Sequence, residues 1–301
     1  MLDLAFNPYL AFSWSILAGF IMAMGGGGGG ILAGIGHISI LGIGDPNMIK
    51  AVNQLLELIS RFFSVPIYHR QKRIVWPLAV AFGIGAPFGA VAGSWFSKSY
   101  LHDMTLYRPV FGILVVLVAT RVLYEILLKA PSRSTKAGKA QLASDKARQA
   151  HIKHLNGKTV ATKPKTVSLG WQKIRIFFSD EEFDFNPVIV ATSAFGISFL
   201  GASIGVGGGF LVTPFMASFL LFPMYLVAGT GLVALMVPLT ASVIAYITMN
   251  VQMDWVLVGI EGAGIIIGSS IAPILNRYMN EKTLKLYVSI ILFGIGFYYL
   301  L

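Results

Sequence analysis

The chain has 301 residues, of which 55% are hydrophobic and 12% are charged, and its formal net charge is +10. Soluble domains carry about 25% charged residues, so this composition excludes a soluble globular protein and predicts an all-α, polytopic integral membrane protein. The chain contains no cysteine, which excludes disulfides and thiol chemistry. The five histidines form no HExxH pair, and we expect neither a metal nor another cofactor.

The positive charge is concentrated in one segment. Twelve of the 23 Lys and Arg residues lie between Lys129 and Arg175. This distribution argues against nucleic acid as a partner and indicates a cytoplasmic topology signal. We expect anionic lipid headgroups to attract the segment 129–175.

The chain contains ten apolar segments, five before a long polar stretch and five after it. The first five lie at about 9–24, 31–43, 47–68, 74–96 and 106–128. The second five lie at about 187–204, 209–222, 225–249, 254–275 and 283–301. We therefore expect a first membrane repeat at 1–128, a basic cytoplasmic linker at 129–186 and a second membrane repeat at 187–301. The linker is rich in Ala, Lys, Ser and Thr before Trp171, which predicts a mobile middle without a packed core.

Two of the apolar segments, 31–43 and 209–222, are shorter than the roughly 20 residues that span a bilayer. Each directly follows a glycine cluster, "GGGGGG" at 25–30 or "GASIGVGGG" at 201–209. Glycine costs about 1 kcal/mol relative to alanine inside a helix. The clusters therefore predict helices that are broken inside the membrane.

The clusters belong to an internal repeat. Shifting one half by 179 positions, the difference between Gly28 and Gly207, also aligns Trp76 with Trp255. The same shift aligns two further glycine pairs, Gly85 with Gly264 and Gly89 with Gly268. The sequence therefore predicts two homologous halves of about five transmembrane segments each.

The charges of the loops predict that the halves have opposite orientations. With the linker 129–186 inside, the loop "HRQKR" at 69–73 is also inside, whereas its equivalent "NVQMD" at 250–254 has no Lys or Arg. The next loop, "NRYMNEK" at 276–282, is again basic. This reversal is typical of inverted-topology repeats in the plasma membrane of a bacterial or archaeal cell.

An alternative remains at this point. If 31–43 and 209–222 are re-entrant and do not cross the membrane, each half has four spans and the repeats are parallel. That arrangement places the basic loop 276–282 outside.

The glycine clusters predict a binding site near the midplane. Broken backbone is tolerated in a bilayer only where it lines a protein-enclosed cavity, and free N–H groups at helix N-termini attract anions. We expect six glycines to frame a site for a small anionic substrate: Gly28, Gly29, Gly30, Gly207, Gly208 and Gly209. The alternative is that glycines only permit close helix packing, which we favour for Gly85, Gly89, Gly264 and Gly268.

A second feature is the charged membrane helix predicted in the first half. In "DPNMIKAVNQLLELISR" at 45–61, Lys50, Asn53, Glu57 and Arg61 recur at helical spacing. Charges in a span normally face a bundle interior or a cavity, so we expect Lys50, Asn53 and Arg61 to bind substrate. The alternative is that Glu57 and Arg61 form a structural pair and that Lys50 extends to the membrane surface.

The remaining candidates are single residues. Thr230, in the matching second-half segment at 226–247, is a further candidate ligand of the substrate. Three titratable side chains are candidates for proton coupling, namely His37, Glu57 and Glu261, although a histidine that is only buried and hydrogen-bonded is an alternative. No Ser/His/Asp set and no catalytic carboxylate pair occurs, so we expect no enzymatic activity.

The chain resembles the TauE/SafE family of membrane permeases, the sulfite-exporter-like family. Three stretches carry the resemblance: "GASIGVGGGFLVTPFM" at 201–216, "AGTGL" at 228–232 and "MDWVLVGIEGAGIIIGSSIAP" at 253–273. The first half departs from the family pattern, because Ile35 stands where the second half has Pro214.

The resemblance implies export of sulfite, an organosulfonate or a related small oxyanion, driven by the membrane potential or by protons. We expect alternating access, in which one bundle moves against the other around a midplane site. The open alternatives are an anion channel and an integral-membrane sensor or enzyme. A homo-oligomer is compatible with all of them.

Overall fold

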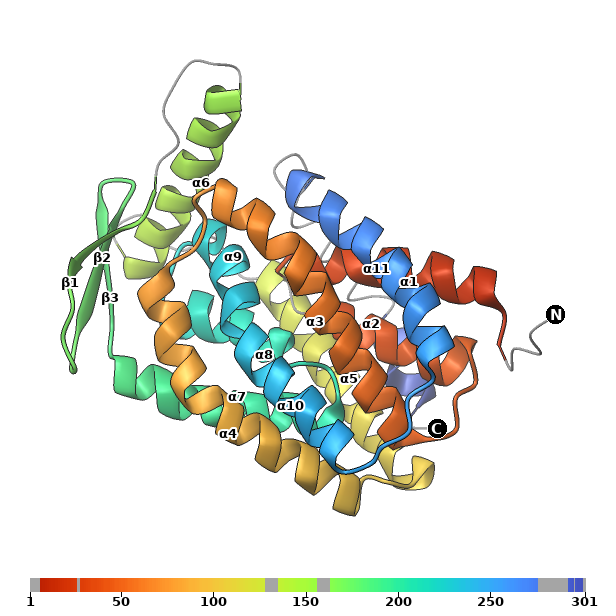
Figure 1. Cartoon of the computed structure of the whole chain (residues 1–301). Coiled ribbons are helices and arrows are strands. Elements are labelled where there is room, and N and C mark those ends of the chain that lie inside the picture. The colour runs from red at the N-terminus through yellow and green to blue at the C-terminus, as the bar shows by residue number, and fades with distance from the viewer. Residues whose placement is uncertain are drawn as a thin grey trace.

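The computed structural model describes residues 6–25, 28–127, 135–155, 163–275, 292–294 and 296–299. It is mostly helical, at 77% (Figure 1). The first half contains α1 (Pro8–Ala23), α2 (Gly29–Ile35), the π-helix η1 (Gly36–Ile40), α3 (Pro46–Arg70), α4 (Trp76–Tyr100) and α5 (Met104–Leu127). The second half contains α7 (Pro187–Ile204), α8 (Gly209–Pro214), the π-helix η2 (Phe215–Phe219), α9 (Met224–Ala234), α10 (Met236–Thr248) and α11 (Trp255–Leu275).

The described helices include several that are long and apolar enough to span a membrane. There are five such spans: α4, α5, α7, the combined run α9–α10, and α11. Large apolar side chains on the outer face of α4 are exposed, including Val80, Ile84, Phe88 and Trp95. Such a continuous apolar surface fits lipid and not water, so the prediction of a polytopic membrane protein is confirmed. The fifth predicted segment of the second half, 283–301, lies mostly outside the described residues.

The glycine clusters interrupt the helices where the sequence predicts breaks. Helix α2 continues into η1, and α8 continues into η2, to give apolar runs of Gly29–Ile40 and Gly209–Phe219. At about 1.5 Å per residue, neither run reaches the roughly 30 Å of a bilayer core. The chain at Gly205 and Gly207 has φ of +79° and +61°, a left-handed conformation that favours glycine.

Helix α4 packs directly along α7. A Cβ placed on Gly85, Gly89 or Gly93 would lie 1.9, 2.0 or 2.3 Å from a carbonyl oxygen of α7. The partners of these three glycines are Ala191, Phe195 and Phe199, in that order. Residue numbers increase in the same direction along both helices, so α4 and α7 run parallel. The predicted close packing at Gly85 and Gly89 is confirmed.

Helix α1 packs in the same manner along α11. A Cβ on Gly264 would lie 2.0 Å from Ser15 Oγ, and one on Gly268 would lie 2.1 Å from the carbonyl oxygen of Ile16. These two helices therefore also run parallel, and close packing is confirmed for Gly264 and Gly268. The first helix of each half, α1 or α7, thus packs against the helix of the fourth apolar segment of the other half, α11 or α4.

Contacts of α3 show how the directions of the pairs α1–α11 and α4–α7 compare. Ser60 accepts a hydrogen bond from Ser269 at 2.7 Å, and Gln71 donates to the Pro273 carbonyl at 3.1 Å, so α3 runs parallel to α11. A short turn at 71–75 connects α3 to α4 and reverses the chain direction. Helices α1, α3 and α11 therefore run in one direction, and α4 and α7 run in the other.

The described residues of the linker form secondary structure, whereas part of its middle, at 156–162, lies outside the described residues. The linker forms α6 (Lys136–Leu155) and an antiparallel sheet of β1 (Lys165–Ser168), β2 (Ile174–Phe178) and β3 (Glu181–Phe185) in that order. Small side chains of α6 and aromatic side chains of the strands are buried, namely Ala140, Ala143, Ala147, Phe178, Phe183 and Phe185. The fold is thus not purely α-helical.

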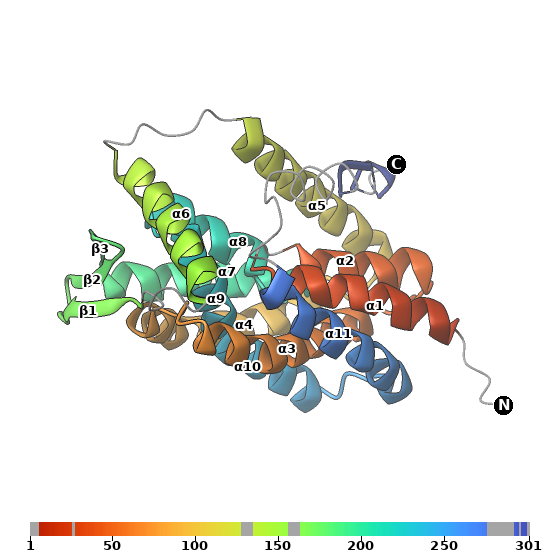
Figure 2. The same cartoon turned by 90° about the horizontal axis from the view of Figure 1, so that it is seen from above.

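This helix and sheet dock on the start of α9. Phe222 contacts Phe183 and Phe185 at ring distances of 5.7 and 5.9 Å, and Tyr225 donates its N–H to Ser144 Oγ at 3.0 Å. Viewed from above, they occupy the end of the molecule away from the N-terminus (Figure 2). The alanine stripe of α6 gives only a weak sequence signal, because its partner surface lies in another part of the chain.

We expect Gly89→Ala to destabilise the protein by about 1–3 kcal/mol, the usual cost of overpacking, because its Cβ would lie 2.0 Å from the Phe195 carbonyl oxygen. Gly196→Ala on α7 is the matched control, since nothing lies within 4 Å of its Cβ position. Thermal unfolding in detergent measures both variants. Equal melting temperatures would contradict the close contact between α4 and α7.

Candidate functional site

A buried ion pair lies near the middle of α3. Arg61 Nη2 is 2.6 Å from Glu57 Oε2, and Arg61 Nη1 donates to the backbone carbonyl of Glu57 at 2.7 Å. The side chains are only 2% and 3% exposed. The spacing of four residues places both groups on one face of the helix. The helix begins with Asp45 as its N-cap and Pro46 in its first turn.

Both glycine clusters approach the Glu57 carboxylate. A Cβ on Gly30 would lie 2.0 Å from Oε1, and a Cβ on Gly207 would lie 2.0 Å from Oε2. Any side chain at either position would therefore collide with the carboxylate. The structure thus brings the clusters of the two halves together, with Glu57 between them.

Asn53 joins the two clusters by hydrogen bonds. Its Nδ2 donates to the carbonyl oxygen of Gly30 at 2.8 Å and to that of Gly205 at 2.6 Å. Asn53 is completely buried. It therefore holds the start of α2 next to the end of α7, and it acts on the backbone of the clusters.

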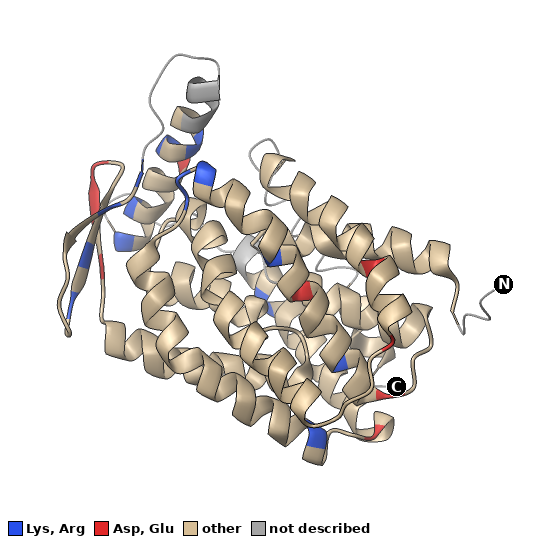
Figure 3. Ribbon diagram, in the orientation of Figure 1, with Lys and Arg blue, Asp and Glu red and all other residues tan. Residues whose placement is uncertain are grey.

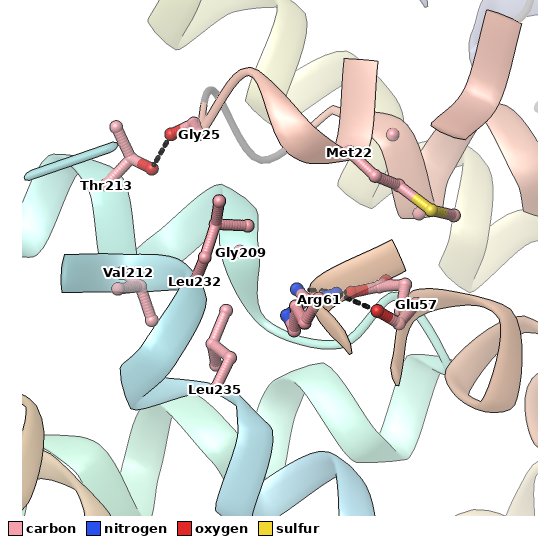
Figure 4. A pocket seen from close by; sticks show the side chains of 12 residues that line it. Met22, Gly25, Glu57, Arg61, Gly209, Val212, Thr213, Leu232 and Leu235 are labelled. Atoms are coloured by element: carbon pink, nitrogen blue, oxygen red, sulfur yellow. Dashed lines mark hydrogen bonds and ion pairs between the residues drawn. The ribbon is translucent and has the colours of Figure 1, made fainter. Parts of the chain in front are cut away.

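A small cavity opens beside the ion pair and is lined by both halves (Figure 4). Its lining comprises Met22, Gly25, Gly29, Gly30, Glu57, Arg61, Gly209, Val212, Thr213, Gly231, Leu232 and Leu235. Thr213 donates a hydrogen bond to the Gly25 carbonyl at 2.6 Å and so closes one side. The space open to the centre of a water molecule is about 20 Å³, which is enough for roughly one water.

Two atoms of the ion pair have no hydrogen-bond partner among the described residues. They are Glu57 Oε1 and Arg61 Nε, and both are buried. An unsatisfied buried polar atom costs about 1–3 kcal/mol, so each such atom in a native structure requires an explanation, and a functional role is one of them. The pair therefore retains unused capacity to bind next to the cavity.

Several residues that the sequence proposes as ligands lie elsewhere. The Lys50 ammonium donates to the carbonyl of Leu101 at 2.7 Å and lies 5.1 Å from the ring centre of Tyr107. It thus neutralises the carbonyl end of α4. The Thr230 hydroxyl accepts the N–H of Val75 at 3.0 Å, and it holds the turn before α4.

Gly28 and Gly208 are also absent from the cavity lining. The Cβ position of Gly208 faces the carbonyl of Ile197 on α7 at 3.4 Å. Of the six glycines proposed from the sequence, those at the ion pair and the cavity are therefore Gly29, Gly30, Gly207 and Gly209.

A second buried pair joins the two halves. His37 Nε2 on η1 lies 2.8 Å from Glu261 Oε2 on α11, and the side chains are 0% and 3% exposed. His37 Nδ1 has no hydrogen-bond partner among the described residues. The structure thus brings together two residues that the sequence offers only as separate candidates.

The comparison with known proteins decides the family. A family model described as sulfite exporter TauE/SafE matches residues 11–299. The chain belongs to the TauE/SafE family. A relative from Bacillus subtilis (strain 168), "Probable membrane transporter protein YunE", is 25% identical over 252 residues, which cover 83% of this chain and 80% of the relative. No solved structure matches the chain.

This TauE/SafE protein is therefore a membrane transporter, and its family motif surrounds the cavity. The stretch 201–216 supplies Gly207 beside the carboxylate and Gly209, Val212 and Thr213 in the lining. Sequence reasoning missed Thr213, although it directly precedes Pro214 in the motif. The available signal was that Thr213 is a polar residue within the otherwise apolar motif segment that follows the glycine cluster.

We expect Asn53→Ala to lower the free energy of unfolding of this TauE/SafE transporter by about 2 kcal/mol, because two buried carbonyls lose their donor. Asn47→Ala on the same helix is the control, since among the described residues only the backbone N–H of Asn47, and not its side chain, forms a hydrogen bond. Thermal unfolding in detergent compares the two variants. A loss of equal size in both would contradict the role of Asn53 between the clusters.

Proposed function

We propose that this TauE/SafE transporter moves a small oxyanion, such as sulfite or an organosulfonate, through the cavity between the glycine clusters. The observation that carries the proposal is the Arg61 guanidinium, buried at a cavity to which both halves contribute. Arg61 is the one cationic residue among those that line the cavity. A guanidinium offers planar, paired donors that match two oxygens of an oxyanion.

The anion site rests on this side chain more than on helix dipoles. The α-helical parts of α2 and α8 have only seven and six residues before the π-helices begin. The glycines instead provide backbone without side chains, so that an anion reaches the guanidinium. The sequence-based argument from helix N-termini is therefore secondary in this proposal.

The small size of the cavity implies that its lining moves when the substrate enters. A space of about 20 Å³ is too small for a sulfite ion together with a hydration shell. The substrate requires movement of α2 or α8, which border the cavity, before it enters. Such a movement of the cavity lining is an element of alternating access.

The packing supports inverted repeats. Helices α1 and α7 hold equivalent places in the aligned halves and run in opposite directions, as do α4 and α11. Exposed Trp76 and Trp255 begin α4 and α11 at opposite ends of the bundle, where aromatic side chains suit the two membrane interfaces. The tight pairs α1–α11 and α4–α7 each combine both halves, so we propose these pairs as the moving units.

We further propose that the linker faces the cytoplasm and anionic headgroups. The 71–75 turn, the start of α9 and the end of α11 lie at one end with the linker, as the contacts of Gln71, Arg73 and Ser144 indicate. Lys and Arg positions are frequent on α6, on the sheet and on the adjacent turn (Figure 3). This asymmetry agrees with the positive-inside rule for a plasma membrane protein.

Coupling to protons is proposed for His37 and Glu261. Their contact joins η1 of the first half to α11 of the second half, so a change in its charge acts on the boundary between moving parts. Histidine changes its charge near neutral pH unless its environment intervenes. The pair therefore connects proton binding with the position of the broken helix α2–η1.

The first test of transport is sulfite flux into proteoliposomes, with sulfate, taurine and sulfoacetate as competitors. We expect saturable flux in the wild type, and a loss of at least about 10-fold in the double variant Glu57→Gln/Arg61→Gln, which removes the guanidinium without leaving a buried charge. Arg175→Gln, an exposed position on β2, is the control. Conductive flux without saturation in the wild type would support a channel.

The second test addresses coupling with a sulfonate, whose charge stays constant around neutral pH. We expect a pH gradient to drive concentrative uptake in the wild type and to have no effect in Glu261→Gln, while counterflow exchange persists. Glu182→Gln, exposed on β3, serves as the matched control. Concentrative uptake that survives in Glu261→Gln would assign coupling to another group.

A further inference from the structure

The Glu57 carboxylate occupies the position where the anion-binding elements converge. Its oxygens face Gly30 from the first half and Gly207 from the second half, and Arg61 holds it at 2.6 Å. A carboxylate has the charge and the paired oxygens of the oxyanions that a guanidinium binds. The protein thus already holds an anion at the proposed substrate site, attached to its own chain.

We propose that Glu57 is a tethered competitor of the substrate, and that the oxyanion binds by replacing the Glu57 carboxylate on Arg61. This inference rests on the proposed function and specifies it. The substrate class is a small anion with at least two oxygens free to accept from the guanidinium. When the substrate leaves, the Glu57 carboxylate binds Arg61 again, so the Arg61 guanidinium is never left without an anionic partner.

Burial gives the physical reason for such an exchange. An unpaired charge in an apolar interior is several kcal/mol less stable than a paired one, and both side chains are at most 3% exposed. Without Glu57, the empty transporter would carry an unpaired Arg61 through its conformational change. With Glu57, the empty state is neutral, and the state loaded with a monovalent oxyanion is neutral as well once the displaced Glu57 carboxylate takes up one proton from water.

The Glu57–Arg61 pair has unused hydrogen-bonding atoms and lies beside a cavity, so an oxyanion can replace the carboxylate there. The Glu57 Oε1 and the Arg61 Nε have no hydrogen-bond partner among the described residues, so the pair uses only part of its donors and acceptors. The cavity adjoins both side chains (Figure 4). The released carboxylate stays near the cavity, because its backbone is fixed in α3.

Other titratable groups around α3 are engaged elsewhere. On α11, Glu261 is bound to His37, and Lys50 on α3 itself is bound to the carbonyl of Leu101. On α10, Tyr246 donates to the carbonyl of Ala202. Glu57 and Arg61 are the only titratable side chains in the cavity lining, so protonation of Glu57 has the same effect as its removal.

Binding of ethanesulfonate to the purified transporter tests the proposal, because the charge of this probe does not change with mild acidification. Glu57→Gln keeps the shape of the side chain and removes the competing charge. We expect it to bind ethanesulfonate at least about 10-fold more tightly than the wild type. We also expect the wild-type affinity to increase as the pH falls, and the affinity of Glu57→Gln to stay constant.

Stability gives a second readout for a variant that folds poorly. Glu57→Gln leaves Arg61 unpaired, so its melting temperature should rise with added ethanesulfonate more steeply than that of the wild type. The double variant Glu57→Gln/Arg61→Gln should not respond. Glu182→Gln should behave as the wild type does, since this side chain is exposed on the linker sheet.

The outcomes separate the two proposals. Weaker or unchanged binding in Glu57→Gln, with normal binding in the wild type, would overturn the competitor role and make Glu57 a positioning residue for Arg61. If no variant and no wild-type protein binds ethanesulfonate or sulfite, the proposed function fails, and this inference fails with it. An infrared change in the wild-type carboxylate bands on binding, absent in Glu57→Gln, would support the exchange directly.

Discussion

The burial of one carboxylate and one guanidinium in an apolar bundle constrains most of the surrounding structure. Removal of one partner of such a pair costs about 3–5 kcal/mol, so Glu57 and Arg61 remain together unless another charge replaces one of them. Backbone without side chains must then approach the pair from both halves, at Gly30 and Gly207. The broken helices are therefore a consequence of holding charge at this depth.

The packing of the long helices determines which parts can move. Glycines allow α4 to contact the carbonyl oxygens of α7, and α1 and α11 meet in the same manner. Contacts of this closeness favour rigid pairs, each of which contains helices from both halves. The short runs α2–η1 and α8–η2 border the cavity between these pairs, and their π-helical turns are typical of functional positions. The cavity is thus bordered by short helices as well as by long ones.

The folded linker has a physical route to the site. Its aromatic residues Phe183 and Phe185 pack on Phe222, and Ser144 accepts a hydrogen bond from the first turn of α9. Further along α9, Gly231 and Leu232 line the cavity. A single helix therefore connects the basic segment with the candidate site. The linker is part of the architecture of the transporter and not merely a connection.

The sequence by itself determined the membrane class, the helix breaks and the charged face of α3, because these depend on composition and on local spacing. It also indicated Arg61, Glu57 and the clusters as candidates. Only the tertiary structure decided that Lys50 caps α4, that His37 contacts Glu261, and that Glu57 lies between Gly30 and Gly207. These relations join residues that are far apart in the chain, and helical periodicity describes only which face a residue occupies, not what that face meets.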